Sequence, residues 1–162
     1  MTEKQKRQFF LAIFILVFYL VGASFVQSFV SYPAWRVVGV NEFNAYYQEL
    51  SSRIIRIMVL PGVLEILLTA ALFWFRPRGI PTWFVELALV FGLLRFVSTA
   101  VIQTRIREQL NSGVLSPDAI TAMIYGDYFT QASSIARALL FVWMMARVMN
   151  QTKLAGTDER AI

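Results

Sequence analysis

Residues 8–35 read QFFLAIFILVFYLVGASFVQSFVSYPAW and contain no Asp, Glu, Lys or Arg. A helix of about 20 apolar residues is long enough to cross the hydrocarbon layer of a bilayer, so this stretch predicts a membrane-spanning helix at 9–30. Lys4, Lys6 and Arg7 before it would also suit a secretory signal peptide, but the apolar run is longer than a signal core. The stretch therefore indicates an integral membrane protein.

Three further apolar runs predict three more spans, at 54–75, 81–104 and 128–149. Four spans with short connections predict an all-α membrane protein, an up-down bundle of four transmembrane helices. Amphipathic stretches beyond the apolar runs predict that helices two to four extend on the outer side. The predicted parts are a cytoplasmic tail at 1–8, a single transmembrane domain at 9–150 that holds the four spans, and a cytoplasmic tail at 151–162.

The composition excludes several classes of protein. Hydrophobic residues make up 57% of the chain and charged residues 15%, whereas a soluble domain has about 25% charged residues. The chain has no Cys and no His, which removes thiolate nucleophiles, imidazole bases and the usual zinc ligands. We therefore predict a lipid bilayer as the surroundings, no metal, no cofactor and no nucleic-acid partner.

The distribution of Lys and Arg predicts the orientation, since these residues are retained in short cytoplasmic loops. More of them fall on the cytoplasmic side when the N-terminus is placed inside. The segment RPRGIP at 76–81 cannot continue a helix and predicts a tight connection on that same side. We expect both termini in the cytoplasm and the protein in a bacterial inner membrane.

Proline and tryptophan mark particular positions. Pro61, four residues before Glu65, predicts a kink in the second helix and a freed carbonyl near that acid. The four tryptophans, Trp35, Trp74, Trp83 and Trp143, are typical of the aromatic belts at the two membrane interfaces.

Three charged residues lie deep inside the predicted spans, where an ionised side chain is costly and marks a functional or structural site. Counted from the outer ends of their spans, Glu65, Arg95 and Arg137 lie about 12 to 17 Å deep at 1.5 Å per residue. Neighbouring polar residues lie one turn away or at a similar outer level. Together they predict a polar cluster of Glu65, Arg95, Arg137, Gln27, Ser98, Thr99, Gln103, Ser133 and Ser134.

This cluster has two interpretations. Two arginines and one glutamate leave one positive charge, which favours an outward-opening pocket for an anionic or strongly hydrogen-bonding ligand. Alternatively, Asp127 or Glu49 supplies the missing negative charge from the outer rim, and the polar network only holds the helices together.

Several short motifs extend along nearly the whole chain. They are Tyr32-Pro33-Ala34-Trp35, Glu42-Phe43, Arg53, Pro61 with Glu65, Gln103 followed by Arg107, Leu110 and Gly113, and Arg137. In their order and spacing these motifs resemble the four-helix membrane family that includes the fungal anthrone oxygenases.

The resemblance implies a metal-free and flavin-free oxidation of an aromatic substrate. The family commonly carries a Gln-x-Pro-x-His pattern in span three, but here the same positions read Gln103-Thr104-Arg105-Ile106-Arg107. An arginine stays protonated and cannot act as an ordinary base. The resemblance therefore supports the fold more than the reaction.

Two hypotheses for the function follow. In the first, the protein binds a small aromatic, quinone-like or anionic amphiphile, with Arg95 and Arg137 holding a phenolate or carboxylate and Glu65 orienting them or accepting a proton. The composition leans against an enzyme, and any activity is expected to be that of a cofactor-independent oxygenase acting on an aromatic substrate. In the second, the protein is a non-catalytic accessory or assembly subunit that docks on partner subunits of a larger membrane complex.

Overall fold

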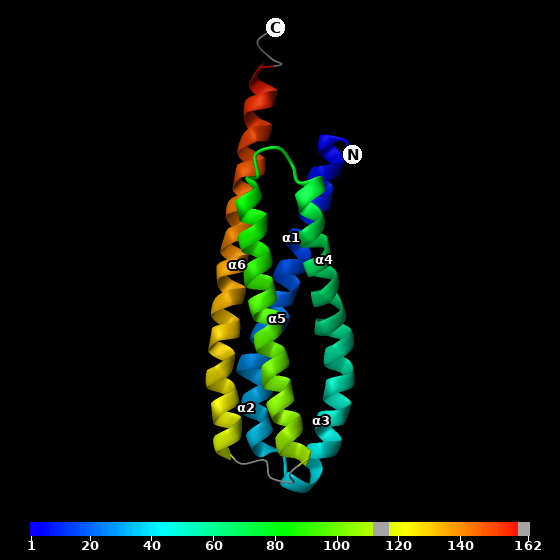
Figure 1. The fold of residues 1–162 in the computed structure, drawn as a ribbon, viewed down its shortest axis with the longest axis vertical. Helices are drawn as coiled ribbons and strands as arrows, with labels where there is room; N and C mark the ends of the chain where they lie inside the picture. Colours follow the sequence, from blue (N-terminus) through cyan, green and yellow to red (C-terminus); the bar gives the residue numbers. More distant parts are fainter. Residues whose placement is uncertain (112–116, 159–162) are drawn as a thin grey trace.

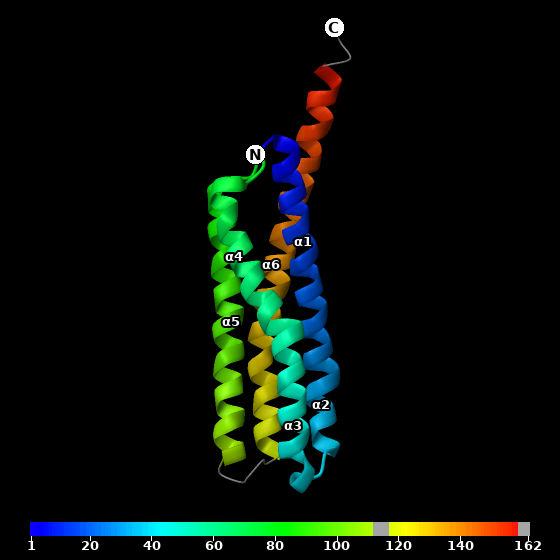
Figure 2. The same cartoon turned by 90° about the vertical axis from the view of Figure 1, so that its right-hand side faces the viewer.

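The computed structural model describes residues 1–111 and 117–158, and the side chains at 40, 102, 103, 105–107, 109–111, 117–120, 122, 123 and 152–158 lie outside that description. The chain forms four long helical rods that stand side by side (Figures 1 and 2). Each rod is long and apolar enough to cross a membrane, and the described part contains no strand. The predicted all-α four-helix bundle is therefore confirmed.

Two of the rods change helix type along their length. The first consists of α1 (Glu3–Val26), the π-helical turn η1 (Gln27–Ser31), α2 (Tyr32–Ala34) and the 3₁₀ turn η2 (Trp35–Val37). The second consists of α3 (Val40–Ile54), the π-helical turn η3 (Ile55–Val59) and α4 (Leu60–Phe75). The third and fourth rods are the single helices α5 (Thr82–Asn111) and α6 (Pro117–Asp158).

The start of α1 and the end of α6 lie at one end of the bundle, together with the connection between α4 and α5 (Figure 1). We call this the terminal end and the opposite one the distal end. Thr2 caps α1, because its hydroxyl accepts a hydrogen bond from the Gln5 backbone while the Gln5 side chain accepts one from Thr2. Helix therefore begins at Glu3, and α6 continues to Asp158, so most of the described part of each predicted tail is helical.

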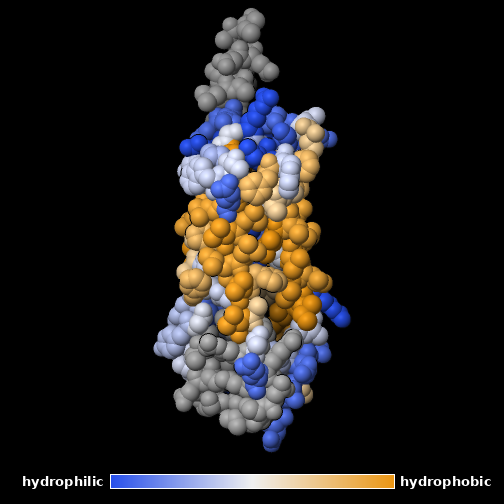
Figure 3. Space-filling view, viewed as in Figure 1, coloured by the Kyte–Doolittle hydropathy of each residue, from blue (hydrophilic) through white to orange (hydrophobic). Residues whose placement is uncertain are grey.

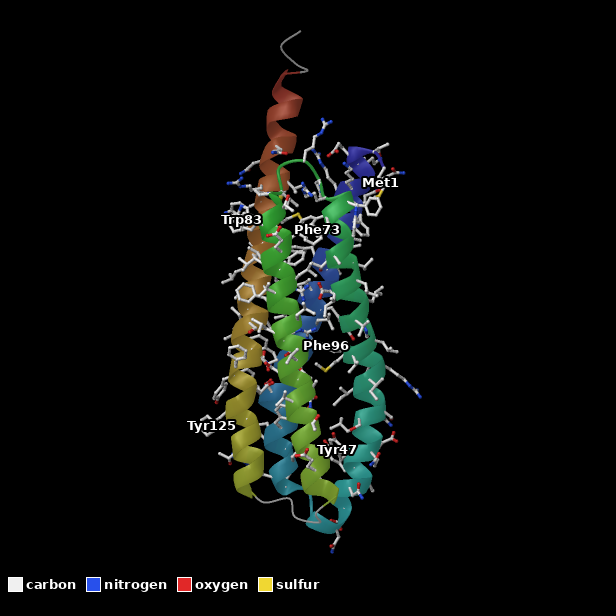
Figure 4. All side chains as sticks on the ribbon, in the orientation of Figure 1. Met1, Tyr47, Phe73, Trp83, Phe96 and Tyr125 are labelled. Carbon is white, nitrogen blue, oxygen red and sulfur yellow. The ribbon has the colours of Figure 1, made fainter. Side chains whose placement is uncertain are left out.

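A band of apolar side chains surrounds the middle of the molecule, and hydrophilic residues lie toward both ends (Figure 3). Such a band is unfavourable in water and is the surface that a bilayer solvates. Each rod contributes large exposed hydrophobic side chains to it, such as Ile15, Leu67, Leu93 and Leu139. Trp83 points outward near the terminal end of this band (Figure 4) and is 55% exposed, as expected of an interfacial aromatic residue.

The two halves of the bundle are packed differently. The terminal half holds a closed apolar core in which Phe10 stacks on Phe141. The distal half holds a separate aromatic cluster of Tyr32, Trp35, Phe43 and Tyr47, and Figure 4 shows Tyr47 in this region.

The prediction that all four tryptophans lie in interfacial belts is wrong for Trp35. Its indole ring contacts Tyr32, Phe43 and Tyr47 edge to face and is only 2% exposed. The turn between the first two rods folds α3 back onto η2, and this contact buries the ring.

Each π-helical turn precedes a proline by two residues. A proline has no N–H and its ring clashes with the carbonyl four residues earlier, so the helix must widen or kink there. For Pro33 and Pro61 these carbonyls belong to Phe29 and Ile57, which lie inside η1 and η3. The hydroxyl of Tyr19 donates to the Ile57 carbonyl at 3.0 Å. The freed carbonyl predicted near Pro61 is therefore present and is bound by α1.

Candidate functional site

A buried ion pair joins α4 to α6. Arg137 donates from Nη1 to Glu65 Oε2 and from Nη2 to Glu65 Oε1, both at 2.6 Å. Thr69 Oγ1 donates to Glu65 Oε1 at 2.7 Å and accepts a longer hydrogen bond, of 3.2 Å, from Arg137 Nη2. Glu65 and Thr69 are 0% exposed and Arg137 is 3% exposed. Both carboxylate oxygens are thus occupied, and the pair carries no net charge.

Arg95 on α5 lies next to this pair without joining it. It borders a small cavity together with Glu65, Arg137 and Ser134. Within the described part of the chain, the guanidinium of Arg95 makes no hydrogen bond and no ion pair. Arginine has five N–H donors and an obligatory charge, so Arg95 carries an unmatched positive charge within the apolar band.

The same arginine also borders a larger cavity in the distal half, with a volume of about 190 Å³. All four rods contribute to its walls, which combine polar and apolar side chains. The polar ones, besides Arg95, include Ser24, Gln27, Ser28, Thr99, Asp127 and Thr130, and the apolar ones include Ile54, Met58, Val59, Phe96 and Ala100.

Two residues that line this cavity each have a buried polar atom without a hydrogen-bond partner in the described part. These atoms are the amide nitrogen of Gln27 and the hydroxyl of Thr130. Buried polar groups in native proteins are nearly always hydrogen-bonded, and each exception calls for an explanation such as a ligand or an ordered water molecule. Both atoms are enclosed by the packing around the cavity, so they mark a polar region of its wall.

A second polar network lies at the wall of the cavity. The carboxylate of Asp127 accepts hydrogen bonds at Oδ2 from Ser28 Oγ and, at 3.1 Å, from Gln131 Nε2. Gln131 Nε2 also donates to Ser24 Oγ at 2.8 Å. Asp127 is 5% exposed and also borders an outer groove between the first rod and α6. The network ties the first rod to α6 and places a carboxylate in the cavity wall.

Two glycines make room for the arginines. A Cβ at Gly92 would lie 2.7 Å from Arg137 Nη1, and a Cβ at Gly62 would lie 3.2 Å from Arg95 Nη2. Contacts this short force a neighbour to move, so the absence of a side chain at each position lets the guanidinium lie against the helix.

The structure brings most of the predicted cluster together in two places. Glu65 and Arg137 form the buried pair, with Ser134 at the adjoining small cavity. Gln27 and Thr99 line the larger cavity with Arg95, which borders both.

The other predicted members lie elsewhere. Ser133 donates to the Phe129 carbonyl of its own helix at 3.0 Å. Ser98 is half-buried and lines neither of these two cavities. The side chain of Gln103 lies outside the described part, as do those of Ile106, Arg107 and Leu110; Gly113 lies outside the described residues.

Sequence reasoning undervalued the polar face of α6. Asp127 entered only as a residue of the outer rim, and Thr130 and Gln131 were missed. These three residues precede Ser134 and Arg137 at spacings of three and four, which place all five on one helix face. That spacing could have identified the face from the sequence.

Comparison with known proteins adds no relative. No family model, curated protein or solved structure matches the chain. The resemblance to the anthrone-oxygenase family therefore stays a prediction. Within the described residues, no group of three or more acidic, His or Cys side chains could hold a metal ion.

Proposed function

We propose that this multi-pass membrane protein binds a small amphiphile, of aromatic, quinone-like or anionic character, in the distal cavity. The observation that carries the proposal is the unmatched guanidinium of Arg95 in the cavity wall. An anionic or carbonyl oxygen at this position would accept its hydrogen bonds and lower the cost of holding the charge in an apolar layer.

The walls of the cavity support an amphiphilic ligand. Binding sites for small molecules are typically mostly apolar, with a few polar groups that fix the orientation. Here Met58 and Phe96 are among the apolar wall residues, and Gln27 and Thr130 are among the polar ones. A ligand with one polar end and an apolar body matches this division.

Glu65 has a positioning role in this proposal rather than the role of a base. Both of its oxygens already accept hydrogen bonds, from Arg137 and from Thr69. The ion pair neutralises Arg137, so Arg95 is left as the cation that faces the ligand. The carboxylate that lines the cavity is that of Asp127. In an oxidation of the ligand, Asp127 would be the candidate proton acceptor.

A pair of arginine variants tests the proposal. Binding of dodecanoate and of 2-methyl-1,4-naphthoquinone to the purified protein would be measured by isothermal titration calorimetry in a mild detergent. Arg95→Gln should weaken the binding of dodecanoate about 10- to 100-fold, since a charge-assisted hydrogen bond contributes about 1.5 to 3 kcal/mol. Ser98→Ala is the matched control, because Ser98 lies on the same helix and lines neither of the two cavities.

A bulky side chain provides a second, independent measurement. Ala100 lines the cavity, so Ala100→Phe should reduce the affinity for both probes by filling space. The proposal is wrong if the wild-type protein binds neither probe, or if Arg95→Gln and Ala100→Phe both bind dodecanoate as tightly as the wild type. The alternative hypothesis, an accessory subunit of a larger complex, stays a prediction.

A further inference from the structure

The cavity holds two opposite charges that do not meet. Arg95 lacks any hydrogen bond or ion pair within the described part, and no ion pair joins it to Asp127. Asp127 accepts its two hydrogen bonds at Oδ2, and its Oδ1 accepts none from the described residues. Both side chains nevertheless line the same cavity of about 190 Å³. Arg95 and Asp127 can thus each form further hydrogen bonds with a ligand in the cavity.

The sum of these charges decides which ligand suits the site. Glu65 and Arg137 cancel within their own pair, and Arg95 and Asp127 cancel only as a sum, because they remain apart. A ligand with a net negative charge would match Arg95 but be repelled by Asp127, and a cation would have the opposite difficulty. A ligand that carries both a negative and a positive group can pair with Arg95 and with Asp127.

Another cation near Asp127 does not remove this need. Arg36 borders the outer groove that Asp127 also borders. Its guanidinium, however, donates to Thr121 Oγ1 at 3.1 Å and forms no ion pair with Asp127. Arg36 is also exposed, so water screens its charge.

The apolar residues that η3 and α5 contribute to the cavity explain how the apolar body of an amphiphile could be accommodated. Figure 2 shows the second rod beside α5 at the terminal end and crossing toward α2 at the distal end. Within the described residues η3 packs on α1. The cavity walls on these two sides are apolar, with Met58 and Val59 on η3 and Phe96 and Ala100 on α5. The apolar body of a ligand would contact these two walls.

We propose that the cavity recognises the head of a zwitterionic amphiphile, with an anionic group at Arg95 and an N–H-bearing cationic group at Asp127. This inference rests on the proposed binding of an amphiphile and specifies its head. Arginine binds phosphate or carboxylate oxygens through two parallel N–H donors, and an ammonium group donates to the free oxygen of a carboxylate. The phosphoethanolamine head of a membrane phospholipid has this chemistry, and so does a water-soluble zwitterion of the same type.

Three lipids with the same acyl chains separate the alternatives. The protein would be purified in mild detergent, mixed with phosphatidylethanolamine, phosphatidylglycerol or phosphatidylcholine, and the retained lipid measured by native mass spectrometry. The wild type should retain phosphatidylethanolamine about tenfold better than phosphatidylglycerol, which lacks the cation, since one charge-assisted contact of about 1.4 kcal/mol corresponds to tenfold. Phosphatidylcholine should bind more weakly than phosphatidylethanolamine, because its quaternary nitrogen has no N–H to donate.

The variants should change the preference in opposite ways. Asp127→Asn removes the negative charge from the cavity wall. The variant should therefore lose the preference for phosphatidylethanolamine and retain phosphatidylglycerol better than the wild type does. Arg95→Gln should lower the retention of both lipids. Glu49→Gln is the matched control, because Glu49 is an exposed acid that pairs with Arg53, and it should leave the preference unchanged.

Each failure would have its own signature. If the wild type retains none of the lipids and binds neither dodecanoate nor the naphthoquinone, the proposed function itself fails. If it retains phosphatidylglycerol as well as phosphatidylethanolamine, and Asp127→Asn changes nothing, amphiphile binding stands and the zwitterion is ruled out. If O-phosphoethanolamine alone competes as effectively as the lipid, the head chemistry is upheld and the requirement for an amphiphile is overturned.

Discussion

Arg137 and Gly92 lie so close together that a Cβ at position 92 would be 2.7 Å from Arg137 Nη1. The guanidinium that binds Glu65 therefore depends on a residue without a side chain on the facing helix, α5. Because Arg137 has no spare room on the side of Gly92, a substitution at position 92 has a definite consequence.

Gly92→Ala should destabilise the protein by about 1 to 3 kcal/mol, the usual cost of overpacking a closed site. Gly22→Ala is the control, because a Cβ there meets nothing within 4 Å and alanine is the better helix former by about 1 kcal/mol. Thermal unfolding in mild detergent, followed by circular dichroism, should show a lower Tm for Gly92→Ala and an unchanged or higher Tm for Gly22→Ala. Equal Tm values for the two variants would contradict the close approach of Arg137.

Glu65→Gln should cost about 3 to 5 kcal/mol, since it leaves the buried guanidinium of Arg137 without its counterion. The double variant Glu65→Leu with Arg137→Met removes both charges and should recover much of that loss. The free energy of unfolding of the single and double variants would be compared in the same detergent. A double variant no more stable than Glu65→Gln would show that the pair contributes more than mutual neutralisation.

Tyr19→Phe should destabilise the bundle by about 0.5 to 2 kcal/mol, the range for a hydrogen bond between membrane helices. The variant leaves the Ile57 carbonyl, freed by Pro61, without the Tyr19 hydroxyl. Tyr128→Phe is the control, because the Tyr128 side chain is exposed and its hydroxyl makes no hydrogen bond within the described residues. The interpretation of η3 fails if the two variants unfold at the same temperature.

The orientation can be tested with single cysteines, because the chain has none of its own. Val37→Cys would place a thiol at the distal end, where Val37 is 86% exposed, and Arg78→Cys would place one in the loop at the terminal end. A membrane-impermeant maleimide should label Val37→Cys in intact cells and Arg78→Cys only after permeabilisation. Labelling of Arg78→Cys alone would reverse the orientation, and labelling of both from one side would contradict four spans.

The fold was predictable because the bilayer imposes a simple length rule. A run such as 8–35, without any charge, is long enough to span the hydrocarbon layer as a helix. An arginine partner for Glu65 was also predictable from the sequence. An acid inside an apolar helix needs a counterion, and the sequence offers few at the same depth. Trp35 was misplaced because its burial comes from α3 folding back on η2, and local composition carries no sign of that contact.

Taken alone, the sequence determined that the chain has four helices long and apolar enough to span a membrane, and that Glu65, Arg95 and Arg137 lie within three of them. Charge and hydropathy act residue by residue, so they can be read without coordinates. Only the tertiary structure decided which arginine holds Glu65. Two arginines at similar depth are equivalent in a sequence, but in the bundle the long side chain of Arg137 reaches from α6 to Glu65 on α4, and the space over Gly92 accommodates its guanidinium. Arg95 is left without an ion pair in the described part of the chain and faces a cavity with Asp127 in its wall.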